Sequence, residues 1–225
     1  MIRFLAPLAA VLAVSPSAPA RADEFQQWLY LSARAPLSRS LVLQDELIAR
    51  LSDDRGGLYE IENSLLLGYK LPHRVTLWAG YVHNPNYAAG EFSVMERRAR
   101  EQITVDDFAA IGRASVSARL RLEQRWRDGI AGTGWRARPY LKLAVPLGGK
   151  SAPVLNLSQE AFVNLNNTAY QTSDGLERLR TAIALSFSVA KAVKLEAGYL
   201  NQHRFVANAP DTDDQVLTAS LGLSF

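Results

Sequence analysis

Residues 114–126, ASVSARLRLEQRW, alternate between apolar and polar side chains along almost their whole length. Alternation with a period of two places the two kinds of residue on opposite faces of a β-strand, whereas a helix would mix arginine with leucine on every face. The stretch is longer than a typical globular strand of about five or six residues. It fits a tilted strand that crosses a bilayer with its apolar face toward lipid, and Trp126 occupies the position of an interfacial aromatic residue.

Ten further segments carry this alternation, and turn-forming residues separate them. They are residues 25–35, 39–52, 59–71, 74–84, 98–106, 135–147, 154–164, 175–190, 193–204 and 215–225. Because a single-chain bacterial barrel is expected to have an even number of strands, we favour twelve, with one more strand hidden in residues 84–95, which otherwise resemble a long surface loop. Ten strands are the alternative if residues 25–35 are not a full strand, and residues 98–106 also fit a short helix. The predicted fold class is all-β, a closed antiparallel transmembrane β-barrel of 10–12 strands.

The N-terminus has the pattern of a secretory signal. Arg3 precedes an apolar run at residues 4–14, and the small residues Ala20 and Ala22 fit a cleavage site. We expect cleavage after Ala22, which divides the chain into a signal peptide, residues 1–22, and a barrel domain, residues 23–225. An uncleaved membrane anchor is the alternative, but the run is too short to span a bilayer. No later run of apolar residues is long enough for a membrane-spanning helix.

Composition excludes several classes of site and partner. Lys and Arg number 25 against 22 Asp and Glu, and removal of Arg3 and Arg21 with the signal leaves 23 against 22, a formal charge of +1. A nearly neutral chain lacks the basic excess of a nucleic-acid-binding protein. Cysteine is absent, so disulfides, thiolate nucleophiles and cysteine metal sites are absent too.

The C-terminus predicts a location. Leu217, Ala219, Leu221 and Leu223 alternate up to Phe225, the last residue. This ending resembles the signal by which barrels of Gram-negative bacteria are recognised for insertion into the cell outer membrane. We therefore expect the insertion machinery, outer-membrane lipids and lipopolysaccharide as partners. With Phe225 in the periplasm, residues 72–73, 148–153 and 191–192 are periplasmic turns, and residues 129–134, 166–174 and 205–214 face outside.

The inward positions are predicted to be strongly basic, with about eight more Lys and Arg than Glu. The basic patch comprises Arg119, Arg121, Arg125, Arg136, Arg138, Lys142, Arg178 and Arg180. Glu123, Glu160 and Glu196 are its expected acidic partners, and Tyr59 is expected to face outward. Arginines paired with glutamates could fill and stiffen the interior, or surplus arginines could line a water-filled path for small anionic solutes. Ten to twelve strands lie between barrels filled by side chains and barrels that leave a channel, and we favour the filled interior.

No catalytic, metal or cofactor site is predicted. The sequence lacks a nucleotide loop, a zinc cluster and a nucleophile elbow. His203 has outward parity near an external loop, as in outer-membrane lipid hydrolases, but the nearest hydroxyl residues, Thr172 and Ser173, lie in a loop. The aspartates at 211, 213 and 214 could bind Ca²⁺, but a calcium site needs about six to eight oxygens, so we favour a solvated loop.

Three motifs resemble one known family. They are LWAGY at residues 77–81, LEQRW at 122–126 and EAGYLNQ at 196–202. They are similar to recurrent motifs of a proteobacterial domain-of-unknown-function family, number 2490, whose members are secreted and regarded as outer-membrane barrels. The resemblance covers residues 25–225 and implies the fold and the location, but no site residue. The sequence thus predicts an outer-membrane barrel that is structural or a porin-like small-solute channel with an arginine-rich lumen; a lipid-modifying hydrolase and a surface-interaction protein are the alternatives.

Overall fold

A computed structural model describes residues 24–149 and 151–225, so the predicted signal peptide and its cleavage site lie outside the described residues. The described chain is almost entirely β-strand, with one short 3-10 turn, η1 (Asp53–Arg55). The strands are β1 (Glu24–Pro36), β2 (Leu41–Ser52), β3 (Gly57–Lys70), β4 (Val75–Ala88), β5 (Glu91–Ile111), β6 (Ala114–Arg127), β7 (Ile130–Pro146), β8 (Val154–Asn164), β9 (Gly175–Ala190), β10 (Val193–Arg204) and β11 (Thr212–Ser224). Within these residues no helix is long and apolar enough to cross a membrane.

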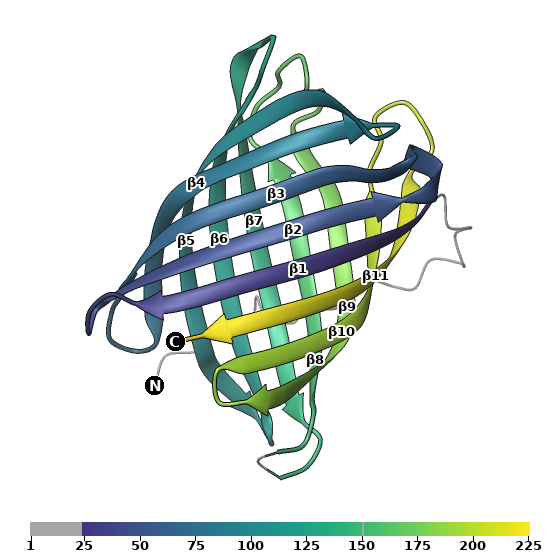
Figure 1. The fold of residues 1–225 in the computed structure, drawn as a ribbon. Coiled ribbons are helices and arrows are strands. Elements are labelled where there is room, and N and C mark those ends of the chain that lie inside the picture. The colour runs from purple at the N-terminus through teal and green to yellow at the C-terminus, as the bar shows by residue number, and fades with distance from the viewer. Residues whose placement is uncertain (1–23, 150) are drawn as a thin grey trace, which may run out of the picture.

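The eleven strands close into one barrel. Every strand pairs antiparallel with its neighbour along the chain, and the seam between β1 and β11 is parallel, from Glu24 beside Asp214 to Arg34 beside Ser224. Figure 1 shows these two strands side by side with their arrowheads pointing the same way. The all-β closed barrel is confirmed, but the preference for twelve strands was wrong. That preference assumed an even number, whereas a parallel seam lets an odd number close.

Residues 84–95 hold no separate strand, because they are the tip of the hairpin between β4 and β5. The connection is Ala89 and Gly90, both with positive φ (50° and 82°), as tight hairpin turns require. A register shift between Asn86 and Tyr87 interrupts the period of two, which explains why the sequence looked like a loop. Residues 98–106 lie within β5 and are therefore strand, not helix.

The barrel has two ends, which we name by residues that lie there. β1 and β11 begin at the Glu24 end and finish at the Phe225 end. The connections at the Glu24 end are residues 53–56, 89–90, 128–129, 165–174 and 205–211, and those at the Phe225 end are residues 37–40, 71–74, 112–113, 147–153 and 191–192. The turns predicted to be periplasmic thus share one end, and the loops predicted to face outside share the other, although the loop predicted at residues 129–134 is only a turn at 128–129 and β7 begins at Ile130.

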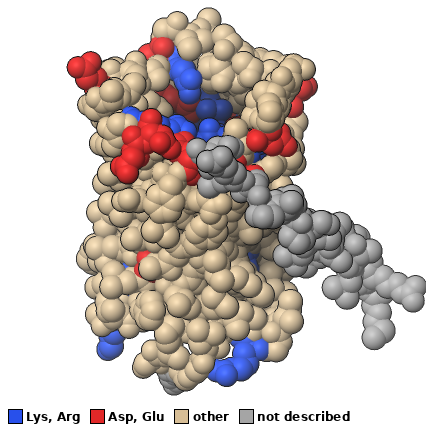
Figure 2. All heavy atoms as spheres, turned by 90° about the vertical axis from the view of Figure 1, so that its right-hand side faces the viewer, with Lys and Arg blue, Asp and Glu red and all other residues tan. Residues whose placement is uncertain are grey.

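The outer face of the barrel is apolar. Large side chains that a soluble protein would bury stand exposed on it, among them Leu65, Leu120 and Leu217, each more than half accessible. Figure 2 shows a broad band of this surface with almost no charged side chain, bounded by charged groups toward both ends. Two outward carboxylates interrupt the apolar face, and each accepts a hydrogen bond from an outward amide: Asp45 from Asn63 and Glu101 from Gln124.

Side chains fill much of the interior. Trp28, Leu200 and Val216 form one buried cluster, and Val42, Leu66 and Trp78 form another. Gly68 makes room for the second, because a Cβ there would lie 2.7 Å from the Trp78 ring. The barrel wall therefore encloses packed groups and not one continuous empty lumen.

One predicted orientation was wrong. Tyr59 faces the interior, where its hydroxyl donates to Gln26 Oε1 at 2.6 Å and accepts from Trp28 Nε1 at 3.1 Å. The register explains the difference: Arg50 pairs with Glu60 and the next residue of β2 pairs with Leu58, so Tyr59 is the extra residue of a β-bulge. A bulge changes the face on which the following residues point, and the alternation read from the sequence loses its phase there.

Candidate functional site

The period of two places arginines from six strands inside one barrel. The predicted basic residues all line one of two interior cavities. Arg125, Arg136 and Arg178 line a cavity that reaches the Glu24 end, Arg119, Arg121 and Lys142 line a cavity on the side of the Phe225 end, and Arg138 and Arg180 line both. We call these the Glu24-side cavity and the Phe225-side cavity.

Glu123 of β6 is the most enclosed acidic group between these arginines. Its side chain is 0% exposed and accepts hydrogen bonds from three guanidinium groups. Arg136 donates from Nε at 3.0 Å and Nη2 at 2.6 Å, Arg138 from Nη1 at 2.9 Å, and Arg100 from Nη2 at 3.0 Å. Charge-assisted bonds of this kind are roughly twice as strong as neutral ones, so this carboxylate ties β5, β6 and β7 together from within.

The other two predicted acidic residues differ from each other. Glu160 accepts from Arg138 Nε and Nη2 at 3.1 and 3.0 Å and pairs with Arg119. Glu196 instead accepts from Asn156 Nδ2 at 2.8 Å, and no described arginine or lysine lies within ion-pair distance of it. The strand register explains this, because the residues beside Glu196 on β9 and β11 are serines 186 and 220.

Two carboxylates that were not among the three predicted acidic partners, Glu62 and Glu96, also bind several arginines each. Glu96 accepts from Arg98 Nε at 2.6 Å, from Arg125 at 2.9 and 3.0 Å and from Arg127 at 3.1 Å. Glu62 lies within 3.2 Å of three guanidinium groups, those of residues 50, 98 and 100. Glu96 was missed because it followed the segment taken for a loop. Its parity with Arg98 could have revealed it, since both face inward on β5.

A row of stacked side chains crosses the interior, and we call it the cation–π ladder. It runs from Arg50 through Trp28, Arg180 and Phe162 to Arg138. The guanidinium carbons lie 4.7 Å (Arg50) and 4.5 Å (Arg180) from the Trp28 ring centre, and 4.5 Å (Arg180) and 4.2 Å (Arg138) from the Phe162 ring centre. All these distances are within the range of about 6 Å for cation–π attraction.

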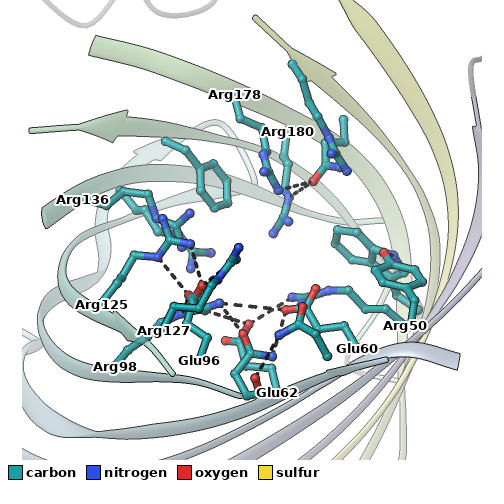
Figure 3. A pocket seen from close by; sticks show the side chains of 18 of the residues that line it. Arg50, Glu60, Glu62, Glu96, Arg98, Arg125, Arg127, Arg136, Arg178 and Arg180 are labelled. Atoms are coloured by element: carbon teal, nitrogen blue, oxygen red, sulfur yellow. Dashed lines mark hydrogen bonds and ion pairs between the residues drawn. The ribbon is translucent and has the colours of Figure 1, made fainter. Parts of the chain in front are cut away.

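The cation–π ladder divides the interior. Its three arginines, together with Glu62, line both cavities, so the ladder and this carboxylate form the wall between them. The Glu24-side cavity measures about 200 Å³ and the Phe225-side cavity about 370 Å³. Figure 3 shows the first of these from close by, with arginines arranged around a central space.

Of the arginines that line the two cavities, two have no carboxylate within ion-pair distance in the described part of the chain. Arg121, 4% exposed, donates from Nε to Gln102 Oε1 at 2.8 Å. Arg180 donates from Nε to Gln202 Oε1 at 2.9 Å. A buried charge is normally paired, so these two guanidinium groups are interior charges that no carboxylate neutralises in direct contact.

His203 and the three aspartates, the candidate hydrolase and calcium residues, lie on β10, β11 and the connection between them. His203 lies between Asp213, 3.2 Å from Nδ1, and Asp211, 3.4 Å from Nε2, and no described hydroxyl group has a recorded hydrogen bond to its ring. Asp214 faces inward and accepts from Gln202 and Arg204. Asp211 and Asp213 therefore both lie against His203, whereas Asp214 faces the interior, and no group of described acidic or histidine residues could hold a metal ion.

The fold and the interior define a class of protein: a closed β-barrel with an arginine-rich, ion-paired core. The chain belongs to the family described as "Protein of unknown function (DUF2490)", which it matches over residues 25–213. An uncharacterized protein of Methylorubrum extorquens is 31% identical over 155 residues, and the match spans 65% of each chain, just under two thirds of the relative's length. No solved structure matches this chain.

Proposed function

We propose that this protein is an outer-membrane β-barrel with an occluded interior, a structural barrel and not an open pore. The apolar outer band supports the membrane part of the proposal, because strands can cross a bilayer only in a closed barrel with an apolar exterior. The terminal Phe225 supports recognition by the insertion machinery. Lipids and lipopolysaccharide are then the partners of the outer face.

The observation that carries the occluded interior is the cation–π ladder. It joins β2, β1, β9, β8 and β7 across the barrel, and its end residues Arg50 and Arg138 are held in turn by Glu62 and Glu160. A solute that moved along the barrel axis would have to separate stacked rings from guanidinium groups and break buried ion pairs. Separating these buried charges would leave them uncompensated in an interior of low dielectric, which makes spontaneous opening rare.

Conductance tests the occluded interior. Purified protein in a planar lipid bilayer should show no steady current, whereas Trp28→Ala, which removes the ring between two ladder arginines, should conduct. Trp135→Ala is the matched control, because Trp135 is 37% exposed on the outer face. Heat-modifiable migration on a gel shows whether each variant is folded. A steady current through the wild-type protein would refute the occluded barrel.

An anion-favouring channel is the second candidate, and the surplus of interior arginine favours it. If wild-type current flows, it should prefer anions, since a basic wall of low dielectric concentrates them. Changing four arginines to glutamine should then shift the reversal potential toward cations: Arg119, Arg121, Arg136 and Arg138. An unchanged reversal potential would place these residues outside the permeation path. We propose no catalytic role.

A further inference from the structure

The Glu24-side cavity carries more positive charge than its carboxylates balance. Ten arginines and three glutamates line it. Five further carboxylates pair with lining arginines from behind, which leaves ten positive charges against eight negative ones; these five are Glu24, Glu123, Glu160, Glu177 and Asp214. Several arginines share one acceptor, as Arg98, Arg125 and Arg127 share Glu96. Like charges held together in a low-dielectric interior repel one another, so this arrangement is stabilised when an anion occupies the central space.

Arg180 has its terminal nitrogens free for such an anion. Its guanidinium lies between the Trp28 and Phe162 rings, 4.5 Å from each centre, and Nε donates to Gln202. Neither of its terminal nitrogens, Nη1 or Nη2, has a recorded hydrogen-bond partner among the described residues. The two rings fix the plane of the group, so its free donors are oriented before any ligand arrives.

Neighbouring arginines complete a pocket around this group. Arg178 shares the Gln202 acceptor, from Nη1 at 3.1 Å. Nη1 of Arg136 has only a distant ion-pair partner, the Glu177 carboxylate 3.9 Å away. Figure 3 shows Arg178 and Arg180 on one side of the central space, with Arg125 and Arg136 on another. Donors from β6, β7 and β9 thus surround one volume.

We propose that the Glu24-side cavity binds a small, doubly charged oxyanion of the phosphomonoester class, with Arg180 as its central ligand and Arg136 and Arg178 beside it. Planar guanidinium forks match phosphate oxygens in pairs, and a dianion offsets more of the surplus charge than a monoanion. The volume of about 200 Å³ is below the roughly 300 to 1,000 Å³ of pockets for drug-sized ligands, so the ligand body is small. This inference concerns the cavity alone and goes beyond the proposed function.

The cavity is reached from the Glu24 end. Figure 2 shows Lys and Arg side chains inside a hollow of the surface, with acidic side chains beside it. Arg55, Asn86 and Arg204, at the ends of their strands or next to them, line the part near this opening. The phosphate could belong to a soluble ester or to a lipid headgroup beside the opening, and the two sources share the chemistry that the arginines recognise.

Isothermal titration calorimetry on the purified full chain in detergent tests the site. Glucose 6-phosphate is the soluble probe, glucose the uncharged control and lipopolysaccharide micelles the lipid probe. We expect glucose 6-phosphate to bind where glucose does not, and Arg180→Gln to weaken binding by about tenfold or more. Arg121→Gln is the matched control, because Arg121 also lies in the interior without a carboxylate within ion-pair distance but lines only the Phe225-side cavity. It should bind as the wild type does.

Each outcome of the titrations either supports or overturns the proposed anion site. Binding of lipopolysaccharide alone, weakened by Arg180→Gln and unaffected by Arg121→Gln, supports the site with a lipid headgroup as its source. No heat from either phosphate probe overturns the proposal, and so does equal weakening by both variants, which indicates general charge attraction. If Arg180→Gln fails to fold by heat-modifiable migration, Arg178→Gln replaces it with the same expectation. The result is independent of conductance, so the site and the occluded barrel can fail separately.

Discussion

Replacing Glu123 by glutamine removes one negative charge from the centre of the arginine network while keeping the size of the side chain. Three guanidinium groups donate to this carboxylate, which is inaccessible to solvent. Glutamine offers one acceptor oxygen in place of two and places an N–H₂ donor next to guanidinium donors. The variant therefore loses ion pairs and gains a donor that faces other donors.

The expected loss in free energy of unfolding depends on which ion pairs each of the three arginines retains in the variant. Arg100 and Arg138 each retain another glutamate at 2.7 and 3.0 Å. Arg136 retains only Glu177, 3.9 Å away, so it becomes a buried charge with almost no compensation. Breaking a buried pair in this way costs about 3 to 5 kcal/mol, and we expect the free energy of unfolding of Glu123→Gln to fall by that amount.

Denaturant unfolding in detergent, followed by tryptophan fluorescence, measures the change. Glu196→Gln is the matched control, because Glu196 also lies inside the barrel but its recorded hydrogen bond is to Asn156. It should change the free energy of unfolding by less than about 1 kcal/mol, the net worth of a typical hydrogen bond. The double variant with Arg136→Gln should recover part of the loss. Equal effects of both single variants would refute the network as a source of stability.

Other changes test other parts of the structure. Deleting Phe225 should reduce the amount of heat-modifiable barrel in outer-membrane fractions without reducing signal cleavage, and normal levels would contradict an assembly role. Gly80→Ala should destabilise the barrel by about 1 to 3 kcal/mol, because its Cβ would lie 2.1 Å from a backbone oxygen, whereas Gly149→Ala, with no atom within 4 Å, should not. Arg121→Gln should leave the unfolding midpoint unchanged or raise it, since removing an unpaired buried charge relieves its desolvation; a large loss would reveal an ionic partner.

The sequence predicted what depends on local alternation. A period of two determines which side chains share a face, so the inward arginines of β6 and β7 could be assigned without a structure. The prediction was wrong at Tyr59, where a bulge shifts the phase, and between β4 and β5, where turn-like residues concealed a long hairpin. Both are changes of register, which leave only a weak trace in composition.

Contacts across the interior were beyond sequence reasoning. Trp28 and Phe162 belong to strands far apart along the chain, and Arg180 joins them only because the barrel closes between β1 and β11. The expected partnership of Glu196 failed for a related reason, since an ion partner depends on which residues stand beside a position in the neighbouring strands. The alternation along a strand predicts whether a side chain points inward or outward. Which side chains it meets there depends on how the barrel closes.

Because of the parallel seam, the start of the first strand and the end of the last strand lie at opposite ends of the barrel. In a barrel with an even number of strands, the first strand begins on the side where the last one finishes. Here Glu24 and Phe225 lie at opposite mouths, so in a membrane a reporter fused ahead of β1 and another fused behind β11 face different compartments. If the barrel spans a membrane as proposed, the leading end of β1 crosses it as a single strand, because five hairpins account for only ten of the eleven strands.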